Sequence, residues 1–335
     1  MGVPAIEARE LTRDYGTVRA VDHVSFTVQP GEVFGFLGPN GAGKTTTMRM
    51  LTTLLEPTSG TALLNGYDVV RQGYQARLQF GVVPEESNVY RELTGRANLL
   101  FAGQLHRLLR QEREERALEL VTRFGLDQVF DTLVDTYSRG MRRKLTICMA
   151  LMHRPKILFL DEPTAGLDVR GQRSIAESIR QLSDERITIL LTTHQIEEAS
   201  QLCGRVAIIN HGQIAAIDTP ENLKQAFQSV QSVEVAFDPS PEDVVEYLKR
   251  LPGVTSVVRR GDKWRAYAAD PGGLVPAIME YAEQRSAPLV SVNTLGPSLE
   301  DVFVQITEQV PSVEGQHRSP SHWGKDSGGQ GGKGP

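Results

Sequence analysis

The sequence lacks several features that would place it in whole classes of protein. Only two of its 335 residues are cysteines, Cys148 and Cys203, and their spacing matches no metal site. No apolar run approaches the roughly 18 residues that cross a membrane. The N-terminus has neither a signal-peptide nor a myristoylation pattern, and the net charge of −5 gives no basic field for nucleic acid. We therefore expect a soluble cytoplasmic chain, with buried cysteines in a reduced compartment and no nucleic-acid partner.

What the chain does have is enough apolar sequence for a core, 40% of its residues. Its length suits one large or two medium domains. Short, continuous apolar runs are typical of strands covered on both faces of a sheet. Alternating runs near the N-terminus, at 5–11 and 21–28, predict antiparallel strands. Buried strands are predicted at 33–37, 80–83, 156–160 and 187–191, and a hairpin at 206–217.

A glycine-rich loop follows the strand predicted at 33–37, with the spacing G-x-x-x-x-G-K-T, and opens a helix expected at 45–55. Backbone N–H groups at such a helix start converge on phosphate oxygens, and glycines let the main chain approach closely. Lys44 is placed to reach β- and γ-phosphates, and Thr45 to offer its hydroxyl to Mg²⁺. The predicted phosphate-binding residues are Gly38, Pro39, Asn40, Gly41, Ala42, Gly43, Lys44, Thr45 and Thr46.

Polar side chains end two of the predicted buried strands. Asp161 and Glu162 follow the strand at 156–160, at the end where α/β folds place ligands. Asp161 is suited to hold Mg²⁺, and Glu162 to orient and deprotonate an attacking water. His194 follows the strand at 187–191. A lone histidine is more often structural. The position at a strand end, the other phosphate-type stretches of the chain and the family resemblance given below together favour a functional role here.

Three other stretches allow two interpretations each. Ser138 is a good N-cap for a helix that continues to about His153, and the basic residues beside it suit either a second anion site or an ordinary capped helix. Tyr15, expected in a loop, is either structural or stacks on a base. Residues 94–124 have a helical pattern, and their charge run at 110–116 is best interpreted as a solvated helix face.

Beyond about residue 228 the pattern changes to the β-α-β-β-α-β order of a ferredoxin-like α+β domain. We expect three parts: 1–227, an accessory or regulatory domain at 228–310, and a disordered tail at 311–335. The predicted strands of the second part are 232–237, 254–259, 264–268 and 289–292, and its helices are 241–251, 273–284 and 298–308.

In this order, the motifs resemble the ATPase subunit of ATP-binding cassette (ABC) transporters over roughly residues 5–225. They match the family's Walker A (38–45), signature (137–141) and Walker B (157–162) motifs, its loop ending in Asp168, and its histidine, His194. The resemblance implies an α/β P-loop NTPase cassette with a RecA-like sheet core, an antiparallel β subdomain and a helical subdomain. It also implies ATP and Mg²⁺ as ligands, and a homodimer that encloses ATP.

The family's roles carry over to matching positions. The resemblance implies that Glu162 is the catalytic base, that His194 senses the γ-phosphate and that Tyr15 stacks on adenine. Ser138 and Gly140 would contact the ATP held by the other copy. The remaining implied sets are Mg²⁺ ligation by Thr45, Glu85 and Asp161, and a dimer interface of Asp168, Ser138, Arg139, Gly140 and Met141.

Two positions depart from the family's pattern. Glu85 stands where glutamine is usual, and it keeps an oxygen for Mg²⁺ but lacks the amide donor. Arg139 stands where the signature has glycine, so its side chain either points outward or contacts the transition state. We expect Arg139 to lower turnover without abolishing it.

The C-terminal part resembles the extension of daunorubicin-resistance-type ATPases of ABC-2 exporters, whose chains end in a motif much like residues 297–303. This implies ABC-2-type membrane permease partners, a peripheral position on the cytoplasmic face of the membrane, and export of a drug, antibiotic or lipid-like substrate. The alternative is a soluble ABC ATPase acting on ribosomes or DNA, although those usually carry two cassettes, coiled coils or zinc-binding cysteines. A P-loop kinase or GTPase needs neither the signature helix nor His194, whereas a non-hydrolysing ATP sensor stays open.

Overall fold

A six-stranded sheet forms the centre of the computed structural model, which describes residues 2–226, 231–268, 270–296, 298–299 and 301–303. The strand order is β10-β9-β3-β8-β7-β6, and neighbouring strands are parallel except for β10 and β9. This is the predicted α/β class. The strands are β3 (Val33–Leu37), β6 (Phe80–Val83), β7 (Ile157–Asp161), β8 (Thr188–Thr193), β9 (Arg205–Asn210) and β10 (Gln213–Asp218).

The central strands are apolar throughout because both faces of the sheet are covered. In β7, Leu158 and Leu160 belong to one hydrophobic core, while Ile157 and Phe159 belong to the other. Successive side chains of a strand point to opposite faces, so a strand between two cores has no polar face. The four-residue apolar run of β7 is therefore explained by its position in the middle of the molecule.

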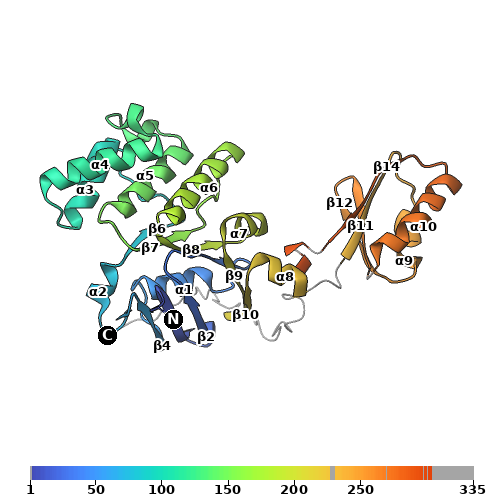
Figure 1. The fold of residues 1–335 in the computed structure, drawn as a ribbon, viewed down its shortest axis with the longest axis horizontal. Coiled ribbons are helices and arrows are strands. Elements are labelled where there is room, and N and C mark those ends of the chain that lie inside the picture. The colour runs from blue at the N-terminus through green and yellow to red at the C-terminus, as the bar shows by residue number, and fades with distance from the viewer. Residues whose placement is uncertain (1, 227–230, 269, 297, 300, 304–335) are drawn as a thin grey trace, which may run out of the picture.

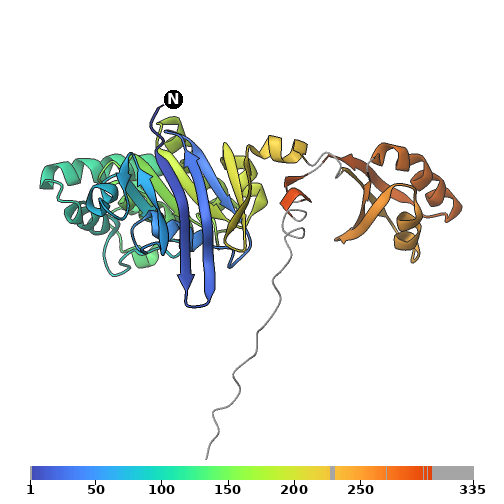
Figure 2. The ribbon, with the colours of Figure 1, turned by 90° about the horizontal axis from the view of Figure 1, so that it is seen from below.

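One face of the sheet packs against a four-stranded antiparallel sheet of order β2-β1-β4-β5, whose long first two strands stand out in Figure 2. Tyr15 is the last residue of β1 and pairs with Val18, so the prediction that it lies in a loop was wrong. Gly16, at φ 59°, begins the two-residue turn between β1 and β2, and glycine adopts this backbone conformation without strain. The elements on this side are β1 (Ile6–Tyr15), β2 (Val18–Val28), β4 (Ser59–Leu64), β5 (Tyr67–Asp68), α1 (Lys44–Leu51) and α2 (Gly73–Arg77).

Helices cover the other face, with α3, α4 and α5 gathered into a helical subdomain (Figure 1). The helical pattern at 94–124 forms two helices rather than one, because the chain turns between them at Arg107, φ 60°. Most of the charge run at 110–116 is exposed on α4, but Arg116, the last residue of the run, is buried. The helices are α3 (Gly95–Leu105), α4 (Arg110–Phe124), α5 (Arg139–Leu151), α6 (Val169–Asp184), α7 (Ile196–Leu202) and α8 (Pro220–Ala226).

The C-terminal part lies at the opposite end of the long axis from α3 and α4 (Figure 1). Its sheet order, β12-β13-β11-β14, with two helices packed on one core, is the ferredoxin-like arrangement that the sequence predicts. Its elements are β11 (Gln231–Phe237), α9 (Val244–Arg250), β12 (Val254–Arg260), β13 (Lys263–Ala268), α10 (Pro271–Gln284) and β14 (Leu289–Leu295).

Several predicted ends change. The P-loop helix stops at Leu51 rather than near residue 55, because Thr53 has φ 59°, which a helix does not allow. The helix expected at 298–308 and the tail at 311–335 extend outside the described residues, which end at 303. Cys148 and Cys203 are buried and unpaired, as predicted. In the part of the chain that the structure describes, no helix has the length and apolar character of a membrane span.

Candidate functional site

The loop between β3 and α1 is packed so tightly at two of its glycines, Gly38 and Gly43, that neither can be replaced without a clash. A Cβ on Gly38 would lie 2.5 Å from the Ile209 carbonyl oxygen, and one on Gly43 would lie 2.7 Å from that of Ala20. Gly43, at φ 106°, is the N-cap of α1 and has no side-chain cap. The first N–H groups of α1 therefore have no side-chain acceptor at the cap, and they can bind an anion.

Lys44 is almost completely buried, at 6% exposure. Its Nζ donates to the carbonyl oxygens of Gly38 at 2.7 Å and Pro39 at 3.1 Å, and lies 3.7 Å from Glu162 Oε1. Burial lowers the pKa of Lys44 from its usual value, against the opposite effect of the Glu162 and Asp161 carboxylates. The ammonium group is thus held at the loop, close to a carboxylate.

Glu162 comes directly after β7 with φ 45°, and its N–H donates to Thr192 on the neighbouring parallel strand. Its Oε2 lies 2.9 Å from His194 Nδ1, just past the end of β8. Thr192 also donates to Asp161 Oδ1, at the end of β7. The parallel strands end at one edge of the sheet, so their polar residues gather beside the glycine loop.

These residues enclose a cavity of about 220 Å³, here called the P-loop cavity. It brings together Glu85, Glu162 and His194 with the loop. Asp161 is not in the described lining and accepts a hydrogen bond from Thr192. Ala20 also lines it, and no sequence motif marked that residue. Tyr15 is not in the described lining: its ring is about half exposed, with the Arg13 guanidinium 4.8 Å from its centroid. The lining is Ala20, Asn40, Gly41, Ala42, Gly43, Lys44, Thr45, Thr46, Glu85, Glu162 and His194.

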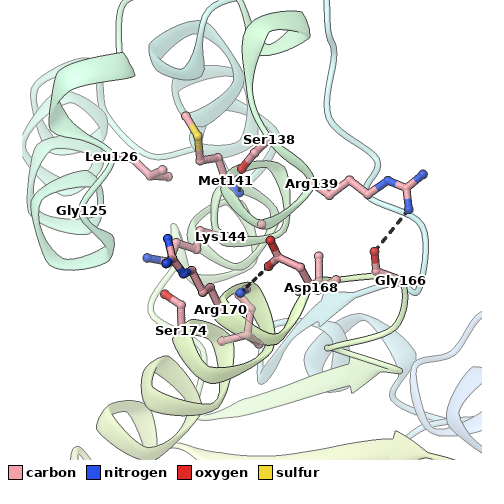
Figure 3. Close-up of a pocket in the computed structure, with 14 residues that line it drawn as sticks. Gly125, Leu126, Ser138, Arg139, Met141, Lys144, Gly166, Asp168, Arg170 and Ser174 are labelled. Atoms are coloured by element: carbon pink, nitrogen blue, oxygen red, sulfur yellow. Dashed lines mark hydrogen bonds between the residues drawn. The ribbon is translucent and has the colours of Figure 1, made fainter.

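A second pocket, of about 550 Å³, lies between the starts of α5 and α6 and is here called the α5–α6 pocket (Figure 3). Two N-caps form its walls. Ser138 Oγ accepts from Met141 N at 3.2 Å, and Asp168 Oδ1 accepts from Gly171 N at 2.7 Å. Gly140 lines the same pocket. Five residues predicted for a dimer interface, Ser138, Arg139, Gly140, Met141 and Asp168, are therefore together.

Arg139 at this pocket extends along the loop before α6. Its Nη1 donates to the Gly166 carbonyl oxygen at 3.2 Å (Figure 3). The side chain is exposed, as in the outward orientation considered from the sequence, and it joins α5 to the loop that ends in Asp168. No described residue lines both pockets, so a single chain keeps them apart.

The sequence left the basic residues after Ser138 as either a second anion site or part of an ordinary capped helix, and neither alternative describes Arg143. Arg143 is 2% exposed and donates to the Glu162 and Pro84 carbonyl oxygens. A signal was available, because Arg143 lies four residues before Ile147 and eight before Leu151, on the buried stripe of α5.

Comparisons with known proteins agree with this geometry. Residues 21–165 match the family model described as ABC transporter. The chain is 44% identical over 225 residues to the daunorubicin/doxorubicin resistance ATP-binding protein DrrA of Streptomyces peucetius, covering 67% of this chain and 68% of that protein. It is 32% identical over 304 residues to the linearmycin resistance ATP-binding protein LnrL of Bacillus subtilis, covering 90% and 98%. A solved ATP-binding subunit of an ABC transporter superposes with a TM-score of 0.60 at 30% identity, covering 67% and 93%.

Proposed function

The chain belongs to the ABC transporter family, and we propose that it is the subunit that binds and hydrolyses ATP to drive export through separate membrane-spanning subunits. The observation that carries this proposal is the P-loop cavity, where Lys44, Glu162 and His194 meet at an uncapped helix start. A phosphate cradle and a carboxylate beside it are what hydrolysis of a phosphoanhydride requires.

ATP binding is assigned to the glycine loop. Its tight packing favours backbone N–H groups over side chains as phosphate ligands, and Lys44 is the cation within the same cavity. Tyr15, exposed at the end of β1, is proposed to stack on the adenine ring. The ATP-binding set is Tyr15, Gly38, Pro39, Asn40, Gly41, Ala42, Gly43, Lys44, Thr45 and Thr46, with Ser138 and Gly140 of a second copy.

Magnesium is proposed as the metal cofactor. Thr45 and Glu85 line the P-loop cavity, and Asp161 ends the adjacent strand, so the donors present are the oxygen ligands that Mg²⁺ prefers. No group of three histidine, cysteine or acidic side chains suited to a metal lies within the described residues, in line with an ion that protein oxygens share with phosphate and water. Bound with ATP, Mg²⁺ would neutralise part of the phosphate charge.

Glu162 is proposed as the general base and His194 as the residue that contacts the γ-phosphate. The Glu162 carboxylate is 9% exposed and lies between Lys44 Nζ and His194 Nδ1. Both neighbours can donate to it, which holds the carboxylate within the cavity where an attacking water would lie. On ATP binding, Lys44 would exchange its contacts with the loop carbonyl oxygens for contacts with phosphate oxygens.

A second copy of the chain is proposed to complete the site. The P-loop cavity contains the carboxylate base but is lined by one helix start, and the α5–α6 pocket offers two more with the cations Arg139 and Arg170. Two copies related by a two-fold axis would place each α5–α6 pocket over the ATP of the other copy.

Export is proposed from the relatives, whose names are those of drug-resistance ATP-binding proteins. An ABC-2-type permease on separate chains, with this subunit on the cytoplasmic face of the membrane, follows from the same likeness. The alternative of a ribosome- or DNA-directed ATPase has no support from these relatives.

The test is a mild-detergent purification of the tagged full-length chain from its own cells, with identification of the co-purifying proteins and an ATPase assay with and without Mg²⁺. We expect a polytopic membrane protein at a fixed ratio, and Mg²⁺-dependent hydrolysis that Glu162→Gln abolishes. Ribosomal or DNA-repair proteins without a membrane partner would overturn the proposal.

A further inference from the structure

Arg143 is a buried arginine on α5 that lies behind the P-loop cavity and does not line it. Its Nη2 donates to the Glu162 carbonyl oxygen at 2.8 Å, and its Nη1 donates to the carbonyl oxygen of Pro84. One guanidinium therefore joins three elements that are distant in sequence: α5, the segment after β6 and the segment after β7.

The two carbonyl groups that it binds belong to segments that contribute residues to the lining of the P-loop cavity. Glu162 is the residue whose carboxylate lies beside Lys44 and His194, and Pro84 directly precedes Glu85 in the lining. Since a carbonyl group and the side chain of the same residue are attached to one Cα, a shift of the Glu162 main chain moves its carboxylate too. Arg143 thus restrains the main chain of Glu162, the residue proposed as the base, without lining the cavity itself.

The Arg143 guanidinium is a buried cation with carboxylates near it. Burial lowers the pKa of Arg143 from its usual value, against the opposite effect of the Asp161, Glu85 and Glu198 carboxylates. Glu198, on α7, is 9% exposed, and burial raises the pKa of its carboxyl group. A buried cation between carboxylates from several elements is costly to remove, because it would leave those charges uncompensated.

The same helix carries the wall of the other pocket. Ser138 caps α5 five residues before Arg143, so the first turn of the helix and the guanidinium belong to one rigid element. We propose that Arg143 is a positioning residue for ATP hydrolysis, which ties the Glu162 and Glu85 segments to α5 so that the base and the α5–α6 pocket move together. This inference rests on the function proposed above.

Only arginine suits this role. The two carbonyl oxygens lie on different segments, and a planar guanidinium can donate to both at once from separate nitrogens. A lysine ammonium would keep the charge among the carboxylates, but it is a point donor on a flexible stem. Arg143→Lys therefore removes the bridge while it spares the charge balance.

The chain offers a matched control. Arg116 on α4 is also a buried arginine, 7% exposed, and its Nη2 donates to the Leu151 carbonyl oxygen at 3.1 Å, away from both pockets. Arg116→Lys removes a comparable buried contact without touching the Glu162 or Glu85 segments. A general loss of packing would affect both variants in the same way.

The experiment measures ATP hydrolysis and ATP binding for the full-length protein and both variants. For Arg143→Lys we expect kcat to fall roughly tenfold, as for a small displacement of a catalytic group, with the Kd for ATP within about twofold. Arg116→Lys should change neither value by more than about twofold. A kcat within twofold of the unaltered protein, or a kcat loss matched by weaker ATP binding, would overturn the inference.

Hydrogen exchange without nucleotide tests the tie directly. Backbone amides at 85–88 and at 161, 162, 164 and 165 should exchange faster in Arg143→Lys than in the unaltered protein, and at an unchanged rate in Arg116→Lys. Unchanged exchange in both would overturn the inference. This measurement needs no hydrolysis, so the two proposals can fail separately. Absence of ATPase activity in the unaltered protein would refute the proposed function, whereas the exchange rates would still test whether Arg143 holds the two segments.

Discussion

The P-loop cavity and the α5–α6 pocket differ in the groups that they present. The P-loop cavity is the smaller, about 220 Å³ against about 550 Å³, and it combines a lysine with Glu85 and Glu162. The α5–α6 pocket has three cationic side chains, Arg139, Lys144 and Arg170, while its one acid, Asp168, caps α6. The first contains the carboxylate proposed as the base for hydrolysis, whereas the second offers positive charge and helix starts.

This difference fits the proposal that the two pockets are unlike halves of one site. The P-loop cavity has the carboxylate proposed as the base, and the α5–α6 pocket has cationic side chains but no free base among its described lining. A symmetric pair of chains would join each half to its complement. The predictions below test this division of roles, from the largest expected effect to the smallest.

Glu162→Gln should lower kcat by about a thousandfold, within the range for loss of a general base, and leave ATP affinity nearly unchanged. The amide keeps the size of the side chain but cannot take a proton from water. Single-turnover hydrolysis and nucleotide binding measured on the same preparation check this. Near-normal turnover would show that Glu162 is not the base. The proposed difference between the P-loop cavity and the α5–α6 pocket would then be wrong.

Lys44→Ala should weaken ATP binding about 30-fold, the loss of roughly 2 kcal/mol expected for a charge-assisted contact to phosphate. Lys144→Ala is the matched control, because Lys144 lines the α5–α6 pocket and donates to the Phe124 carbonyl oxygen. In the isolated chain its ATP affinity should be unchanged. Equal losses in the two variants would mean that the pockets do not divide the roles as described.

Mixing two variants that are each impaired in a different pocket should restore activity. Ser138→Arg fills the α5–α6 pocket, and Lys44→Ala impairs the P-loop cavity, so a mixed dimer keeps one undamaged pair of halves. An equal mixture should recover about a quarter of normal ATPase activity, since half of the dimers are mixed and each has one good site of two. Activity no higher than the average of the two variants alone would contradict a site shared between copies.

Arg139→Gly should raise kcat about twofold at unchanged ATP affinity. Its contact with the Gly166 carbonyl oxygen is exposed, so it contributes on the order of 0.5–1 kcal/mol, and its loss frees the loop that ends in Asp168 to adapt to a second copy. Steady-state ATPase rates over a range of ATP concentrations measure the effect. A rate equal to or below that of the unaltered protein would show that Arg139 does not restrain turnover.

Local features of the site could be predicted from the sequence because their chemistry depends on neighbours in the chain. The glycine spacing before Lys44, the apolar run before Asp161 and the cap at Ser138 each act within a few residues. The ferredoxin-like order of the C-terminal part was predictable for the same reason, since each element has its own periodicity.

Other features depend on packing between distant segments. Arg143 has the same charge as Arg142, and only the position of β6 and β7 beside α5 decides that one of them is buried. Tyr15 was expected in a loop, but pairing with β2 extends β1 as far as Tyr15. Local propensity does not determine that pairing. The direction of Arg139 likewise follows from the loop at Gly166, 27 residues later.

By itself the sequence determined which chemical groups the chain carries and in which order: a glycine loop with Lys44, a carboxylate pair at 161–162, a capped helix at Ser138 and His194. These follow from residue type and local spacing. The tertiary structure alone decided that Lys44, Glu162 and His194 share one cavity and that Ser138 lies in another. It also decided that Arg143 holds Glu162 from behind, because side chains far apart in sequence meet only when the strands and helices that carry them pack together.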